Sequence, residues 1–216
     1  MLELSFLQAA SVPKILCLGA HSDDLEIGCG GTILRLTSEI QTASVCWVVL
    51  SADQEQRREE ALAGATAFLE QAAEKRVIVE GFRESFFPFA GERIKERLRE
   101  ISSTFDPDLV FTHYRHDLHQ DHKLVADITW QTFRRSLILE YEIPKWDGDL
   151  GTPNLYVPLS DAVVERKIRL LCDTFISQRT RHWFTADTFR ALMRLRGVEA
   201  NRPFAEAFYG RKLVLT

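Results

Sequence analysis

The chain contains 216 residues, of which 45% are hydrophobic and 27% charged, and it carries a formal net charge of −4. This balance is typical of an ordinary globular protein and excludes a disordered or fibrous chain. The slightly acidic net charge argues against a nucleic-acid partner. A membrane-spanning helix needs about 18 apolar residues in a row, and no apolar run approaches that length. We expect one domain over residues 1–216, with a core at about 13–136 and a C-terminal part, 137–216, that completes the pocket.

The start of the chain and its cysteines predict a cytoplasmic location. No basic residue precedes the apolar residues of the first segment, so a secretory signal is not expected. The cysteines form no C-x-x-C pair, and such dispersed cysteines are typical of reduced thiols. They are Cys17, Cys29, Cys46 and Cys172.

Short buried strands alternate with amphipathic helices in the first part of the chain. Strands are predicted over Lys14–Ala20, Ala43–Leu50, Arg76–Glu80 and Asp108–Thr112. Helices are predicted over Thr32–Ile40, over residues 54–72 after an Asp53 cap, over Gly91–Phe105 and from about Asp121 to Arg135. This alternation predicts an α/β fold, a Rossmann-like three-layer sandwich with a mostly parallel central sheet.

The pattern is less regular after residue 138. Prolines and glycines between Leu139 and Leu159 indicate a loop, with one late strand at Leu155–Val157. Helices are predicted over Asp161–Ile176 and Ala186–Arg196, and the tail Arg211–Thr216 is expected to be an edge strand.

Two polar clusters follow predicted strands. The first is His21-Ser22-Asp23-Asp24, directly after the first strand, and the second spans residues 113–122, which hold four of the six histidines. In open α/β sheets, ligands bind beyond the carboxyl ends of the strands. The two clusters are therefore the candidate site.

These residue types at this spacing are typical of a metal centre. His21 and Asp24 can converge in a tight turn, and zinc hydrolases use three protein ligands plus water. Either His119 or His122, three residues apart on one helix face, can complete the set, with Asp121 as the helix cap. Asp23 diverges from its neighbours, so it is suited to take a proton from metal-bound water.

Both clusters resemble the signatures of a known family. AHSDDLEIGCGGT, residues 20–32, is similar to the AHPDD-type signature of the PIG-L/LmbE metal-dependent deacetylases. HQDH, residues 119–122, is similar to the second signature, and FISQ (175–178) and AEAF (205–208) also resemble family members. Ser22 and Gln120 stand where the family usually has proline. The resemblance implies a Rossmann-like fold and zinc-dependent removal of N-acetyl groups from amino sugars or glycoconjugates.

The resemblance also implies a role for each motif residue. The expected zinc ligands are His21, Asp24 and His122, and the expected general base is Asp23. His119 is expected to be the charged imidazole that stabilises the tetrahedral intermediate or protonates the departing amine. Asp121 is expected to orient a histidine. Another divalent transition metal fits the same ligands. The expected partner is a small N-acetylated sugar or glycoconjugate, without a nucleic acid or a membrane. The sequence leaves a homo-oligomer open.

Other residues near the strand ends have less specific signals. Arg57 and Arg58 open the helix after the second strand and are predicted to bind substrate, with surface pairing to neighbouring glutamates as the alternative. His113 and His116 are interpreted as loop scaffolding, and the loop Tyr141–Leu150 has no assigned role. The glycines at 28, 30 and 31 lack the third glycine of a dinucleotide motif.

Three alternatives compete with the deacetylase interpretation. The same ligands fit a metal-dependent hydrolase of another acyl or carbamoyl amide. Two histidines and a carboxylate also form the site of Fe(II) oxygenases, although those use a different spacing on a different fold. The non-catalytic alternative is a Rossmann-like sugar- or nucleotide-binding module whose histidines are structural.

Overall fold

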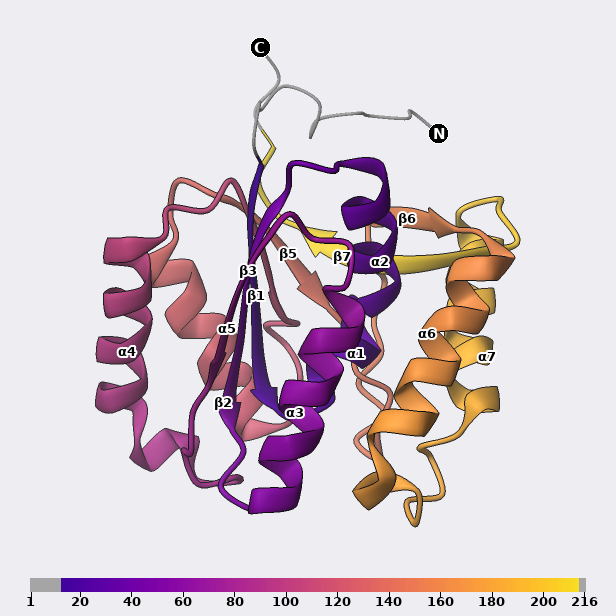
Figure 1. Cartoon of the computed structure of the whole chain (residues 1–216). Coiled ribbons are helices and arrows are strands. Elements are labelled where there is room, and N and C mark those ends of the chain that lie inside the picture. Colours follow the sequence, from indigo (N-terminus) through magenta and orange to yellow (C-terminus); the bar gives the residue numbers. More distant parts are fainter. Residues whose placement is uncertain (1–12, 214–216) are drawn as a thin grey trace.

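The computed structural model describes residues 13–213 and contains the predicted α/β sandwich. A seven-stranded sheet with the order β3-β2-β1-β4-β5-β7-β6 runs through these residues (Figure 1). The strands are β1 (Lys14–His21), β2 (Ser44–Ser51), β3 (Glu74–Val79), β4 (Leu109–His113), β5 (Leu137–Tyr141), β6 (Leu155–Leu159) and β7 (Phe204–Gly210). β1 to β5 pair in parallel, and β7 is antiparallel to both of its neighbours.

Helices cover both faces of the sheet. They are α1 (Asp24–Gly28), α2 (Gly30–Glu39), α3 (Glu55–Phe68), α4 (Gly91–Thr104), α5 (Gln120–Thr132), α6 (Asp161–Thr174) and α7 (Ala186–Glu199). In Figure 1, α4 and α5 lie on one side of the strands, and the other helices lie on the opposite side. The three layers enclose two apolar cores.

β1 is apolar along its length because both of its faces are covered. Side chains alternate between the two faces of a strand, and here each face is covered by helices. Ile15 and Cys17 therefore pack in one core, whereas Leu16 and Leu18 pack in the other.

The order of the strands places the site. The chain runs from β1 outward through β2 and β3, then returns to β4 on the other side of β1. The loops after β1 and β4 therefore leave the sheet at a switch point, where α/β proteins bind ligands. This arrangement brings residues 21–24 beside residues 113–122.

The second half differs from the sequence-based expectation in two strands. β5 lies where the sequence indicated the start of a loop, because its Glu140 looks polar but is buried, paired with Arg211. The last strand is Phe204–Gly210, inside the sheet between β5 and β6, and not an edge strand over Arg211–Thr216. Residues 214–216 lie outside the described residues.

Buried charged side chains link β7 to α2 and α6. Glu206 accepts hydrogen bonds from the amides of Gly31 (2.8 Å) and Thr32 (2.7 Å) at the start of α2. Lys167 of α6 pairs with the same carboxylate at 2.6 Å. A carboxylate at a helix N-terminus satisfies amides that have no partner within the helix.

One helix start was predicted wrongly. α3 begins at Glu55, and its N-cap is Gln54 rather than Asp53. The Gln54 side chain makes no capping hydrogen bond, and Asp53 is exposed.

Close packing at Gly28 provides a stability prediction. A Cβ at this position would lie 2.1 Å from Cδ2 of the fully buried Tyr141, whose hydroxyl donates to the Leu18 carbonyl. We expect Gly28→Ala to lower the free energy of unfolding by about 1–3 kcal/mol, as overpacking does. Urea denaturation measures the change. Gly81→Ala is the control, because a Cβ there has no atom within 4 Å, and an equal loss in both variants would contradict the packing argument.

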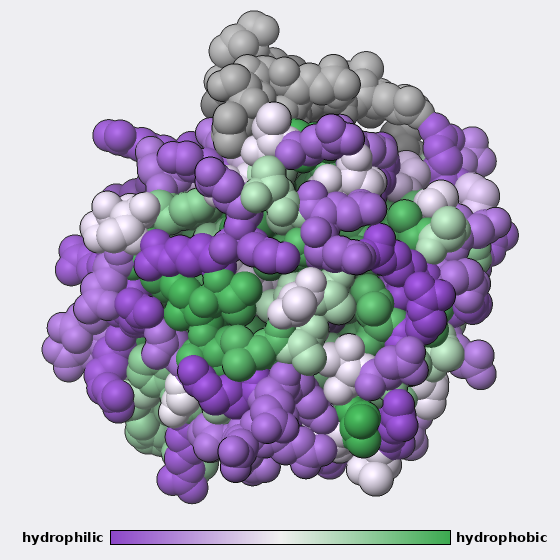
Figure 2. All heavy atoms as spheres, in the orientation of Figure 1, coloured by the Kyte–Doolittle hydropathy of each residue, from purple (hydrophilic) through white to green (hydrophobic). Residues whose placement is uncertain are grey.

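Figure 2 shows polar and charged side chains over most of one face, with a group of apolar side chains near its centre. Among the described residues, no helix is both long and apolar enough to cross a bilayer.

Candidate metal centre and active site

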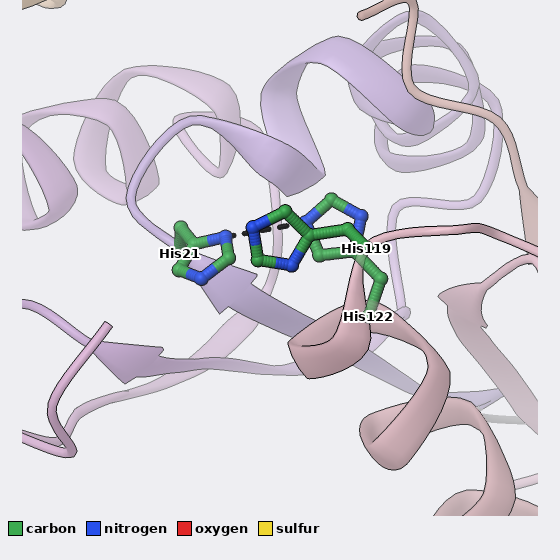
Figure 3. Close-up of side chains that lie close together, drawn as sticks. All are labelled: His21, His119 and His122. Carbon is green, nitrogen blue, oxygen red and sulfur yellow. Dashed lines mark hydrogen bonds between the residues drawn. The ribbon is translucent and has the colours of Figure 1, made fainter. Parts of the chain in front are cut away.

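Three imidazoles meet at the carboxyl end of the sheet. His21 is the last residue of β1, His119 is the N-cap of α5, and His122 lies in the first turn of α5. Figure 3 shows the three side chains close together. Nδ1 of His21 lies 3.2 Å from Nε2 of His122, although the two residues are 101 positions apart.

Asp24 completes a compact set of donor atoms. Its carboxylate lies 3.4 Å from Nδ1 of His21 and 3.5 Å from Nε2 of His122. Metal–nitrogen bonds of about 2.0–2.1 Å in a tetrahedral zinc site separate neighbouring ligand atoms by about 3.3 Å. The three residues are buried, so the donor set fits a divalent transition metal in both spacing and chemistry.

Asp24 and His122 also lie near His113, but His113 has another partner. The Ala20 amide donates to Nε2 of His113 at 2.9 Å, so this lone pair is occupied. Nδ1 of His113 is buried and has no hydrogen-bond partner among the described residues. His113 therefore contacts the end of β1, but it also lies with Asp24 and His122 in a group that could hold a metal ion, so its scaffolding role stays a prediction.

His119 also faces this centre and has one nitrogen occupied. Its ring lies 4.9 Å from that of His21 and 4.5 Å from that of His122. Its Nδ1 accepts a hydrogen bond from the Asp121 amide at 3.2 Å, as the cap of α5. Nε2 is therefore the nitrogen of His119 without this contact, and His119 forms with His21 and His122 a group that could hold a metal ion.

Asp117 was missed by the sequence analysis. Its carboxylate lies 2.9 Å from Nδ1 of His122 and accepts from the His119 amide at 2.7 Å, and Lys145 approaches it at 3.0 Å. A carboxylate on the second nitrogen of a ligating histidine fixes its tautomer and ring orientation. The only signal for Asp117 was its place within the histidine-rich segment.

Asp121 holds His21 rather than capping α5. Its carboxylate lies 3.0 Å from Nε2 of His21 and accepts from the amides of Ser85 (2.6 Å) and Phe87 (3.1 Å). The expected cap is thus wrong, because the side chain turns toward the loop after β3 and His119 caps the helix. Burial opposes ionisation, but the hydrogen bond with His21 lowers the pKa of Asp121.

Asp23 lies beside the donor set in a strained conformation. Its φ of 100° is in the left-handed region, which residues other than glycine rarely adopt. The side chain is buried, and its Oδ1 lies 3.3 Å from the Arg57 guanidinium. Burial raises the pKa of Asp23 to about 7, near the value that suits a general base at neutral pH.

The histidine pKa values move in opposite directions. Burial and the nearby His113 lower the pKa of His122 to about 3, which keeps the imidazole neutral and able to bind a metal. Burial would lower the pKa of His21, but hydrogen bonds to Asp121 and Asp24 outweigh it and raise the value to about 10.

The two arginines differ in their surroundings. The terminal nitrogens of Arg57 contact Ser22, Asp23, Glu60 and Ser177. Arg58 is exposed and donates to the Val79 carbonyl at 2.8 Å. Substrate binding by either arginine stays a prediction.

An α/β sandwich with a buried His–Asp donor set at the switch point of its sheet defines a class of candidate metal-dependent enzymes. Residues 16–133 match the PIG-L family, described as GlcNAc-PI de-N-acetylase. The chain belongs to this family, as the resemblance of its two signatures implied, and the family is one of metal-dependent deacetylases.

Solved structures share the fold over most of their length. The conserved protein TT1542 from Thermus thermophilus has 20% identity and a TM-score of 0.74, with 94% of this chain and 96% of that chain covered. The N,N'-diacetylchitobiose deacetylase from Pyrococcus horikoshii has 20% identity and a TM-score of 0.66, with 90% and 82% covered. The 4-carboxy-2-hydroxymuconate hydratase GalB from Pseudomonas putida KT2440 has 19% identity and a TM-score of 0.73, with 94% and 98% covered.

Proposed function

We propose that this protein is a metal-dependent N-deacetylase, with zinc as the metal, that acts on an N-acetylated amino sugar or glycoconjugate. The observation that carries the proposal is the spacing of 3.2–3.5 Å among donor atoms of His21, Asp24 and His122, with the Asp23 carboxylate beside them. Family membership and the deacetylase relative support the same reaction. The hydratase relative shows that the fold alone does not select the chemistry.

The ligand assignment is part of the proposal. His21, Asp24 and His122 would hold the ion, with Asp121 and Asp117 orienting the two imidazoles from behind. A bound divalent ion supplies Lewis acidity and lowers the pKa of water. Because each imidazole has a carboxylate on its second nitrogen, both rings are fixed before a ligand arrives.

Two residues would carry out the proton transfers. Asp23 takes a proton from the attacking water as the carbon–oxygen bond forms at the acetyl carbonyl. His119 directs Nε2 at the substrate, where it stabilises the charge that develops on the carbonyl oxygen and then donates a proton to the departing amine. The carbon–nitrogen bond breaks, the amine takes up a proton, and acetate and a free amino sugar result.

The C-terminal part, residues 137–213, would complete the site by contacting residues that surround the proposed ligands and base. Lys145 contacts Asp117 behind His122, and Ser177 contacts Arg57 beside Asp23. Both residues lie beyond residue 136, the expected end of the core.

The decisive experiment measures release of the free amino sugar from a panel of N-acetylated sugars and from their N-formyl, N-carbamoyl and N-propionyl analogues. We expect hydrolysis of at least one N-acetyl sugar, its loss after chelation and its return with Zn²⁺ or another divalent transition metal. Preference for the carbamoyl analogue would favour the alternative amide. Tight sugar binding without bound metal or turnover would favour the binding module.

A further inference from the structure

We propose that Arg57, Glu60 and Ser177 form a clamp that positions Asp23 for proton transfer. The inference rests on the proposed function, because it assigns these residues to the same reaction. It makes Arg57 a positioning residue rather than a substrate ligand, and it links the C-terminal part of the chain to the general base.

The first contact of the clamp is on the turn that carries the base. One terminal nitrogen of Arg57 donates both to the Ser22 carbonyl and to Oδ1 of Asp23, the latter at 3.3 Å. The Ser22 hydroxyl donates back to the Arg57 carbonyl at 3.0 Å. Since Asp23 has a φ of 100°, the turn needs such contacts to keep its conformation.

The second contact holds the arginine itself. The other terminal nitrogen of Arg57 donates to Oε2 of Glu60 at 3.1 Å and to the Ser177 hydroxyl at 3.2 Å. Only 6% of the Glu60 surface is exposed, and the Arg57 side chain is 13% exposed. The four bonds of the two terminal nitrogens fix the guanidinium plane, and burial makes any lost partner costly.

The third contact comes from the segment between α6 and α7. The Ser177 amide donates to Oε1 of Glu60 at 2.8 Å, and its hydroxyl donates to Oε2 at 2.6 Å. Glu60 therefore has partners on both oxygens. FISQ, which the sequence analysis noted only as similar to family members, thus supplies the serine of the clamp.

Positioning of this kind acts on turnover more than on substrate affinity. A base must lie within hydrogen-bond reach of its proton, and a shift of about 1 Å can cost about 100-fold in rate. We expect Glu60→Gln, which keeps the size but removes the charge that orients Arg57, to lower kcat by about 10- to 100-fold. KM and metal content should stay within about twofold of the wild type.

The matched control is Glu59→Gln, the same change at the exposed neighbouring position. It should leave kcat unchanged. A rise in KM at unchanged kcat for Glu60→Gln would overturn the proposal, since it would place Glu60 in substrate binding. Metal loss from Glu60→Gln would overturn it as well. Ser177→Ala is the milder second variant and should lower kcat in the same direction without unfolding the protein.

A double-mutant cycle tests whether the clamp acts through Asp23. In an Asp23→Asn background, Glu60→Gln should change the residual kcat by less than about twofold, because the residue it positions is already lost. An undiminished further loss would overturn the proposal.

Crystal structures of the metal-loaded wild type and of Glu60→Gln provide a readout that does not depend on turnover. We expect the Asp23 carboxylate to leave Arg57 or to occupy a second rotamer in the variant. An unchanged Asp23 would overturn the clamp. If the wild type hydrolyses no substrate, the proposed function fails, and this comparison still decides whether the clamp positions Asp23.

Discussion

Replacing Asp23 by asparagine is expected to lower kcat by about 10²–10⁴-fold, the usual contribution of a general base. Asparagine keeps the size of the side chain and can still contact Arg57, but it does not accept a proton from water. The metal ligands are untouched, so metal content and KM should stay close to wild-type values. Steady-state acetate release and elemental analysis of the same preparation measure both quantities.

Asp53→Asn is the control for the Asp23 experiment. Asp53 is exposed and lies two residues beyond β2, so removing its charge should leave kcat unchanged. Near wild-type kcat in Asp23→Asn would assign the base to another group. Metal loss from Asp23→Asn would instead make Asp23 a ligand.

Replacing His122 by alanine is expected to abolish metal binding and turnover together. The change removes one donor of the set and leaves His21 and Asp24, too few for a stable site. Because loss of an orienting partner alone costs about 10–100-fold in metal affinity, loss of a ligand should cost more than about 100-fold. Competition with a chromophoric chelator measures the affinity.

Two further variants provide an intermediate case and a control for the His122 experiment. Asp117→Asn keeps the ligand but weakens the contact with Nδ1 of His122, so its affinity should fall by only about 10–100-fold. His182→Ala removes an exposed histidine that contacts Trp146 and should change nothing. Equal metal content in His122→Ala and the wild type would show that His122 is not a ligand.

The sequence indicated the place of the site because the rule behind it is topological. Parallel strands end at one edge of the sheet, so polar clusters after the first and fourth strands were expected at the same edge, and the strand order of the structure makes them neighbours. Residue spacing did not decide between His119 and His122 as the third ligand. The resemblance favours His122, and the choice stays a prediction, although Nε2 of His122 lies 3.5 Å from Asp24.

Contacts between residues from distant parts of the chain could not be predicted from the sequence. Asp117 is one acidic residue among many until its contact with His122 is seen. Glu60 looks like part of a charged helix surface, but it is buried against Ser177, 117 residues away. Likewise, β5 and β7 contain the buried acids Glu140 and Glu206, whose partners lie on other elements. Because acidic residues are unusual in buried strands, the sequence pattern did not predict these two strands. A single sequence contains no signal for such pairs.

The place of β7 inside the sheet has a consequence for the order of synthesis. During translation, β1 to β5 can pair as they leave the ribosome, but β6 has only β7 as a strand neighbour. A nascent polypeptide that ends before Phe204 would leave the side of β5 open and α2 without the Glu206 carboxylate. Open strand edges promote aggregation. Polypeptides truncated before this strand should therefore be cleared or aggregate rather than accumulate as a smaller enzyme.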